Sequence, residues 1–273
     1  MSDNLKTYPP LFIGGAGRSG TTLLRVMIDS HPEIACGPEI KIFGQTASLW
    51  KMAVNSQVKN ILGEYGLSKD EIDANFRNFC FSFIEKFRKS KGASMWAEKT
   101  PTNISHLPFF MEVFPGSRFI HMIRDGRDVV SSLIKQEWTT LTPSGKSEKI
   151  WYTKDIVHAS IYWKKVNIDA IKFISDNPSY QSRYMRVFYE DLVNNPEKIL
   201  NNICDFLNID FSEEMLNYHD QEHSFNAHES STAQVRKPLN TSSIGRWKKE
   251  MSQKDKEDFY STAGGLLKLL KYD

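Results

Sequence analysis

Short apolar segments alternate with longer amphipathic ones along this chain, and the alternation predicts strands and helices in turn. Residues 11–13 are apolar and run into Gly14-Gly15, as a buried strand does when it enters a tight turn. Apolar residues at helical spacing follow over residues 21–30 and predict a helix. Further strands are predicted at residues 94–97, 118–123 and 184–188.

The remaining periodic segments read as helices. They cover most of residues 45–90, then residues 129–134, 155–175, 196–207 and 251–270, while residues 138–150 read as a loop. One face of the long helical region is apolar and is predicted to pack in the core; it comprises Phe76, Phe79, Cys80, Phe83, Ile84 and Phe87. Alternating strands and helices predict an α/β fold, with a central parallel sheet flanked by helices, in a single domain over residues 1–273.

Composition excludes several classes of protein. The chain has 273 residues, and 35 Lys and Arg against 33 Asp and Glu give a formal charge of +2. This balance excludes a broad basic surface for nucleic acid but leaves a local anion site open. No segment is apolar enough to span a membrane, and residues 1–10 are too polar for a signal peptide. Three cysteines without metal-ligand spacing are then expected to be reduced, in a cytoplasmic protein.

The segment Gly14-Gly15-Ala16-Gly17-Arg18-Ser19-Gly20-Thr21-Thr22 lies between the first predicted strand and the first predicted helix. Glycines there allow backbone amides to converge on a phosphate, and the helix N-terminus adds positive partial charge. The spacing is that of a P-loop, except that Thr21 stands where a P-loop NTPase has lysine. The pattern therefore indicates a P-loop-like phosphate site whose nearest cation is Arg18. It is also compatible with a strand–helix turn that binds nothing.

Arg124 follows the predicted strand at residues 118–123 and opens a helix that contains Ser132. Ligands of open parallel sheets bind beyond the carboxyl ends of the strands, where an arginine can hold a phosphate with two hydrogen bonds. The alternative is a surface network in which this arginine, or Arg127, pairs with Asp125 or Asp128. A late basic segment between residues 236 and 249 contains five cations, and is compatible with either an ordered binding loop or a solvated face.

Four segments in order give the chain a family resemblance. They are FIGGAGRSGTTLLRVMIDSHPEIACGPE (12–39), FIHMIRDGRDVVSS (119–132), YMRVFYEDLVNNPEKIL (184–200) and VRKPLN with IGRW (235–247). Together they resemble the sulfotransferases that use 3′-phosphoadenosine 5′-phosphosulfate (PAPS), and most closely the tyrosylprotein sulfotransferases. The resemblance implies transfer of a sulfuryl group to an acceptor hydroxyl, with adenosine 3′,5′-bisphosphate as the second product.

The same resemblance assigns roles to individual residues. Arg18, Ser19, Gly20, Thr21 and Thr22 match the residues that hold the 5′-phosphosulfate, while Arg124, Ser132, Tyr189 and Lys237 match nucleotide contacts, the first two at the 3′-phosphate. Lys99 matches a lysine beside the transferred group, and Glu39 matches the catalytic base. Arg18 and Lys99 can supply the positive charge that the leaving phosphate needs, so no metal is expected.

The acceptor is predicted with less detail than the nucleotide. An ordinary carboxylic acid has a pKa of about 4.3 and a phenol about 10, so proton transfer is expected to accompany formation of the S–O bond. His106, just after the Lys99 turn, is the rival base. The first expectation for the acceptor is a tyrosyl or phenolic hydroxyl, and the alternative is a carbohydrate or another small alcohol.

Three departures from the tyrosylprotein enzymes bear on the acceptor and on location. Those enzymes are membrane-anchored and luminal. They carry a second acidic residue where this chain has Pro38. They also pair a cysteine near Cys36 with one close to the catalytic lysine, and this chain has Trp96-Ala97 at that second position. A peptide acceptor is the part of the resemblance that the Pro38 difference affects most. An ATP-dependent small-molecule kinase and a nucleotide-binding regulatory module are the other classes considered. A homodimer is compatible with the length and is frequent among relatives.

Overall fold

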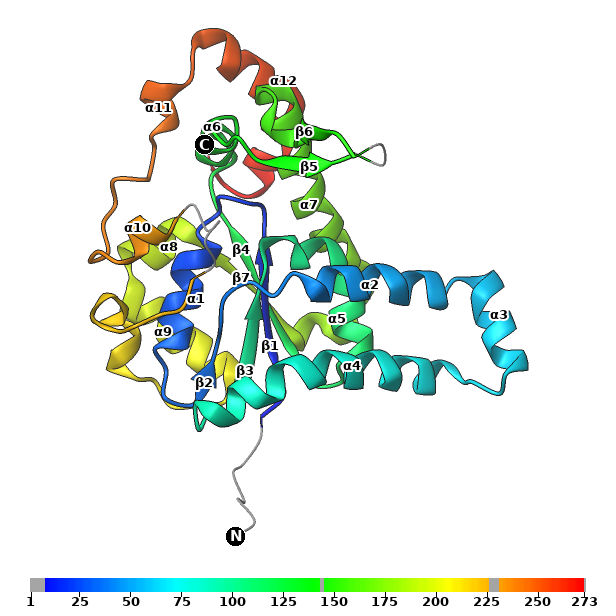
Figure 1. The fold of residues 1–273 in the computed structure, drawn as a ribbon. Coiled ribbons are helices and arrows are strands. Elements are labelled where there is room, and N and C mark those ends of the chain that lie inside the picture. The colour runs from blue at the N-terminus through cyan, green and yellow to red at the C-terminus, as the bar shows by residue number, and fades with distance from the viewer. Residues whose placement is uncertain (1–7, 143–144, 226–230, 273) are drawn as a thin grey trace.

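Five parallel strands form the main sheet, in the order β2-β3-β1-β4-β7 (Figure 1). The computed structural model describes residues 8–142, 145–225 and 231–272. The strands are β2 (Ile34–Ala35), β3 (Met95–Lys99), β1 (Leu11–Gly15), β4 (Arg118–Ile123) and β7 (Tyr184–Phe188). Because β1 is flanked by β3 on one side and β4 on the other, the loop after β1 lies where the strand order reverses, the usual position of a ligand site.

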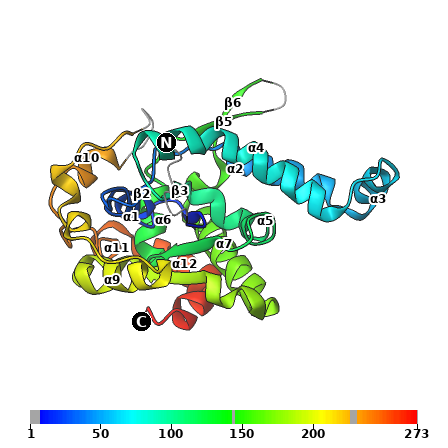
Figure 2. The same cartoon turned by 90° about the horizontal axis from the view of Figure 1, so that it is seen from below.

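Helices cover both faces of this sheet, as Figures 1 and 2 show. Strand β1 is buried on both sides, and its residues alternate between two hydrophobic clusters. Phe12 packs in the cluster that contains Phe43, Trp163 and many other large aromatic side chains. Its neighbour Leu11 packs in the cluster on the opposite face. This arrangement confirms the predicted α/β fold with a central parallel sheet flanked by helices.

The helices of the described ranges have the following bounds. In the first half of the chain they are α1 (Thr21–Asp29), α2 (Ile42–Ala53), α3 (Ser56–Glu64), α4 (Lys69–Ser90), α5 (Leu107–Val113) and α6 (Gly126–Leu133), with a 3-10 helix at Pro101–His106. In the second half they are α7 (Ile156–Asp176), α8 (Tyr189–Asn194), α9 (Pro196–Leu207), α10 (Thr232–Val235), α11 (Trp247–Glu250) and α12 (Gln253–Leu269).

The long helical region at residues 45–90 is three helices that form an arm projecting from the sheet (Figures 1 and 2). Helix α4 begins at a capping box made by Ser68 and Glu71. The prediction that its whole phenylalanine face is core was wrong in part, because Phe79 and Phe83 are 48% and 45% exposed. Their rings contact each other edge to face at 5.0 Å. Only the narrower strip that faces the rest of the domain is buried, since the arm has solvent on its other sides.

The predicted loop at residues 138–150 contains a two-stranded antiparallel hairpin, so that prediction was also wrong in part. Its strands are β5 (Thr139–Leu141) and β6 (Ser147–Lys149). They are three residues long and largely exposed, so they lack the alternating apolar positions by which a strand is recognised in a sequence.

Residues 1–7 of the polar N-terminal segment and residues 143–144 of the predicted loop lie outside the described residues. Within the ranges that the structure describes, no helix has both the length and the apolar character needed to cross a membrane. The three cysteines, Cys36, Cys80 and Cys204, are buried as free thiols.

Candidate active site

The loop between β1 and α1 has the conformation of an anion-binding loop. Gly20 is the N-cap residue of α1 with a φ of 90°, and a Cβ on it would lie 2.4 Å from the Tyr189 ring. Glycine is therefore required there both by backbone conformation and by space. Helix α1 has no side-chain cap at its N-terminus, so its first amides are available to a ligand. Thr21 and Thr22, in the first turn, line a cavity at this point.

The carboxyl ends of four neighbouring strands meet at this loop. Strand β1 leads into the loop itself, β3 ends at Lys99, β4 is followed by Arg124, and β7 is followed by Tyr189. Parallel pairing places these ends on one edge of the sheet. The structure thus brings together predicted site residues that are far apart in the sequence.

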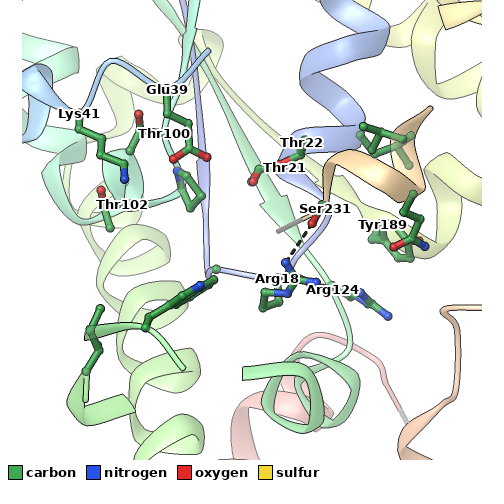
Figure 3. A pocket seen from close by; sticks show the side chains of 18 of the residues that line it. Arg18, Thr21, Thr22, Glu39, Lys41, Thr100, Thr102, Arg124, Tyr189 and Ser231 are labelled. Atoms are coloured by element: carbon green, nitrogen blue, oxygen red, sulfur yellow. Dashed lines mark hydrogen bonds between the residues drawn. The ribbon is translucent and has the colours of Figure 1, made fainter. Parts of the chain in front are cut away.

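Two arginines and Ser231 lie together on one side of the site (Figure 3). Arg18 donates from Nε to Ser132 Oγ at 3.0 Å and from Nη1 to Ser231 Oγ at 2.9 Å. Arg124 donates from Nη1 to the backbone oxygen of Arg18 at 3.2 Å. Burial, and then the nearby charge of Arg124, lower the pKa of Arg18. Two cations held this close together are electrostatically complementary to an anion.

Two buried polar atoms support the same interpretation. Ser19 Oγ and Arg124 Nε are buried and have no hydrogen-bond partner among the described residues. A buried polar atom without a partner is costly, and a bound ligand is one means of satisfying it. The Arg124 guanidinium also lies over the Tyr189 ring at 4.5 Å, which fixes its plane. These residues fit a phosphorylated ligand.

A lysine–glutamate ion pair lies next to the loop. The Lys99 ammonium is 2.5 Å from Glu39 Oε1 and 3.3 Å from Thr22 Oγ1. The Lys99 side chain is fully buried at the end of β3, whereas Glu39 is partly accessible and lines the cavity. The two residues are 60 positions apart in sequence, and the fold places one against the other.

One cavity of about 860 Å³ connects these groups and has two sides (Figure 3). The side that we call the arginine half comprises Arg18, Thr21, Arg124, Tyr189 and Ser231. The side that we call the carboxylate half comprises Glu39, Lys41, Thr100, Thr102 and His106. Lys99 and Thr22 join the two, because Lys99 hydrogen-bonds to Thr22 of the loop and to Glu39. A cavity of this size and shape can hold two reactants end to end.

His106 belongs to the carboxylate half, at the end of the 3-10 helix that follows Lys99. Burial, and then the charge of Lys51, lower its pKa, so the imidazole is neutral at pH 7. A neutral imidazole can accept a proton, so His106 stays a rival to Glu39 as the base. Lys41, the N-cap residue of α2 in the same half of the cavity, has a left-handed backbone conformation with a φ of 60°, which is strained for a residue other than glycine.

The C-terminal loop contributes to the cavity, but not through the lysine that the resemblance pointed to. Lys237 is exposed and is not among the cavity-lining residues, whereas its neighbours Val235 and Pro238 are. Its backbone oxygen accepts a hydrogen bond from Tyr218. The assignment of Lys237 to the nucleotide therefore stays a prediction.

Several cavity residues carry no recognisable signal in the sequence. Ser231 contacts Arg18 from more than 200 positions away. Tyr162 and Tyr152 stack at 4.0 Å, and Tyr162 Oη accepts the Gly17 amide at 3.0 Å, which anchors an aromatic wall to the loop. Tyr162 lies in an amphipathic helix, where an aromatic residue predicts core packing; only the tertiary fold places its hydroxyl at the loop.

Comparisons with known proteins agree with this geometry. The sequence model of the sulfotransferase family matches residues 9–213. The chain is 30% identical over 257 residues to the protein-tyrosine sulfotransferase of Drosophila melanogaster, covering 90% of this chain and 49% of that protein. It is also 30% identical to protein-tyrosine sulfotransferase 2 of Gallus gallus, covering 89% of this chain and 64% of that protein.

A solved structure shares the fold. The sulfotransferase domain from the curacin biosynthetic pathway superposes with a TM-score of 0.65 at 20% identity, covering 98% of this chain and 99% of that one. The chain spans about half to two thirds of the length of the two curated relatives named above. The family match extends over more than half of the chain and includes the loop after β1, the Lys99 strand and the Arg124 turn. The chain therefore belongs to the sulfotransferase family.

Proposed function

We propose that this protein transfers a sulfuryl group from PAPS to an acceptor hydroxyl, with a tyrosyl or phenolic hydroxyl as the first acceptor to test. The observation that carries the proposal is the Lys99–Glu39 ion pair beside a P-loop-like segment that lacks the P-loop lysine. Lys99 comes from a neighbouring strand and brings a cation to the loop from the acceptor side. Family membership and the names of the two curated relatives support the same activity.

The arginine half is suited to the nucleotide. Arg18 and the first-turn threonines, Thr21 and Thr22, would hold the 5′-phosphosulfate, with Ser19 Oγ and the amides of α1. Arg124, with its unsatisfied Nε, would hold the 3′-phosphate together with Ser132. When bound, PAPS supplies the sulfuryl group and leaves as adenosine 3′,5′-bisphosphate.

The carboxylate half is suited to the acceptor. Glu39 Oε2 or Oε1 would accept the acceptor hydroxyl proton as the new S–O bond forms, and Lys99 would stabilise negative charge on the leaving phosphate oxygen. The pair also fixes Glu39, since a buried ammonium 2.5 Å away restricts its side-chain rotation. These roles ask for alignment and charge stabilisation, which are the main contributions to the related phosphoryl transfers.

The direct test uses PAPS labelled in the sulfuryl group with a panel of tyrosyl peptides, simple phenols and sugars. We expect label to appear on the tyrosyl or phenolic acceptors and adenosine 3′,5′-bisphosphate to be released in equal amount. Label on sugars alone would show that the acceptor is a carbohydrate and would leave the proposed sulfuryl transfer unchanged. A parallel titration distinguishes the kinase alternative: binding of ATP with magnesium, but not of adenosine 3′,5′-bisphosphate, would overturn the proposal.

A further inference from the structure

The helix that follows Arg124 holds a buried acidic group that is not among the cavity-lining residues. Asp128, in the first turn of α6, has a side chain that is 1% exposed. Its Oδ2 accepts the backbone N–H of Gly245 at 2.7 Å, and its Oδ1 accepts that of Trp247 at 2.9 Å. One carboxylate therefore binds two amides of a segment that is more than 100 positions further along the chain.

The same carboxylate contacts Arg124. Arg124 Nη2 lies 3.8 Å from Asp128 Oδ2 and donates a hydrogen bond to the backbone oxygen of Ser243. Arg124, Asp128 and the turn from Ser243 to Trp247 thus form a closed set of contacts. A buried carboxylate is stable only when such partners compensate for lost hydration. If the turn were displaced, the Asp128 carboxylate would lose its two amide donors and the Arg124 guanidinium would lose the Ser243 acceptor.

The two arginines of this turn have different tasks. Arg127 is held by Asp125, at 2.7 Å, and its guanidinium lies over the Trp247 ring at 4.1 Å. Arg124, in contrast, lines the cavity. The remaining groups of the turn, Asp125, Arg127 and Asp128, therefore serve to dock the C-terminal segment rather than to bind ligand.

The docked segment is also part of the cavity wall. Val235, Pro238, Leu239 and Asn240 line the cavity just before the turn that Asp128 holds. Gln234 adds a contact, because its side-chain amide donates to Ser243 Oγ at 2.7 Å. Asp128 therefore contributes both to the position of this wall and to the orientation of Arg124.

We infer that Asp128 is a positioning residue for the nucleotide: it orients Arg124 toward the 3′-phosphate and fixes residues 235–247 as a wall of the same half of the cavity. The inference rests on the proposed function, since it takes the 3′-phosphate as the anion that Arg124 binds. It differs from the alternative considered for this motif, in which the arginines and acidic residues form a solvated surface network.

The test compares two nucleotides that differ only in the 3′-phosphate. In Asp128→Asn one of the two amides faces an N–H group instead of an oxygen, and the charge beside Arg124 is lost. We expect affinity for adenosine 3′,5′-bisphosphate to fall by about tenfold or more, and affinity for 5′-AMP to fall by a clearly smaller factor. Asp169→Asn is the control, because Asp169 forms an exposed ion pair with Lys165 on α7.

A second measurement needs no ligand. Hydrogen exchange of the Gly245 and Trp247 amides should be faster in Asp128→Asn than in the wild type or the Asp169→Asn control, because each loses or weakens its acceptor. If Asp128→Asn does not fold, Asp128→Glu keeps the charge but shifts the carboxylate, and the same comparison applies. Equal losses for the two nucleotides, or unchanged exchange at both amides, would overturn the inference.

The two proposals fail in different ways. A wild-type protein that does not bind adenosine 3′,5′-bisphosphate contradicts the proposed function, whatever the exchange data show. If the wild type binds this nucleotide and Asp128→Asn loses affinity for both nucleotides equally, only the role of Asp128 is contradicted.

Discussion

The two halves of the cavity are built in different ways. The arginine half is built around strand ends and a glycine-rich loop, and its arginines are held by buried or half-buried partners. Ser132 and Ser231 hold Arg18, and the backbone of Ser243 and the Tyr189 ring hold Arg124. The carboxylate half comes from the start of α2 and the 3-10 helix after β3, where Lys41 and Thr102 are exposed.

This difference indicates how the site divides its work. In the arginine half, each guanidinium is oriented by several contacts and presents its donors in a defined geometry, which suits a nucleotide. In the carboxylate half, Lys99 holds Glu39, while Lys41 and Thr102 form an exposed rim, which suits acceptors of differing shape. Changes in the first half should therefore reduce binding, and changes in the second should reduce turnover.

Loss of Lys99 should have a large effect on turnover. In Lys99→Ala the buried ammonium beside Glu39 and the loop is gone, so charge on the leaving phosphate loses a donor. We expect turnover to fall by about 100- to 1000-fold in a labelled-PAPS assay. Lys165→Ala on α7 is the control, because that lysine forms only an exposed ion pair. A fall of less than threefold would show that Lys99 has no part in the transfer.

A substitution at Gly20 should instead break the arginine half. Gly20→Ala places a Cβ where φ is 90° and where the Tyr189 ring is 2.4 Å away. We expect the free energy of unfolding to fall by about 1–3 kcal/mol and affinity for adenosine 3′,5′-bisphosphate to fall with it. Gly265→Ala is the matched control, since nothing lies within 4 Å of its Cβ and helix α12 should gain up to about 1 kcal/mol. Equal stability of the two variants would contradict the requirement for glycine at position 20.

Most of the arginine half could be predicted from the sequence, and the residues that could not be predicted have a physical reason in common. The loop after β1 and the Arg124 turn are local: a few consecutive residues determine backbone shape, and parallel strand ends must meet at one edge. Ser231 reaches Arg18 only through tertiary folding, as does Tyr162 at Gly17. Single domain extent over residues 1–273 and cytoplasmic location stay predictions.

The same distinction explains the errors in the predicted elements. Helical spacing identified the apolar face of α4, but Phe79 and Phe83 are exposed because spacing does not reveal that the arm leaves the domain. The hairpin of β5 and β6 was missed because its strands are short and exposed. Periodicity reports which side of an element is apolar, not what packs against it.

Acid should weaken the sheet that supports both halves. His121 on β4 is fully buried, with Tyr184 and Asn167 as partners, and burial lowers its pKa to about 3. Since an unfolded histidine has a pKa of about 6.5, the unfolded state binds the proton first, and stability falls as pH decreases from about 6.5 toward 3. The slope should approach about 1.4 kcal/mol per pH unit. Urea unfolding at pH 7 and pH 5 measures this pH dependence of the free energy of unfolding. A smaller slope in His121→Gln would assign the dependence to His121.

Loss of His106 should have the smallest effect of the four. If Glu39 is the base, His106→Ala should reduce turnover by less than about tenfold, below the 100- to 10,000-fold expected for a general base. Its nucleotide affinity should be unchanged, because His106 lies in the carboxylate half. A loss of more than 100-fold, with a matching change in the pH profile, would transfer the role of base from Glu39 to His106.

The central claim is that the arginine half binds the nucleotide and Glu39 of the carboxylate half reacts. Glu39→Gln tests it most directly, with affinity for adenosine 3′,5′-bisphosphate and turnover of labelled PAPS measured on the same preparation. The account predicts nucleotide affinity within about twofold of wild type and turnover reduced by at least about 100-fold. Wild-type turnover in Glu39→Gln, or loss of nucleotide affinity in proportion to activity, would contradict it.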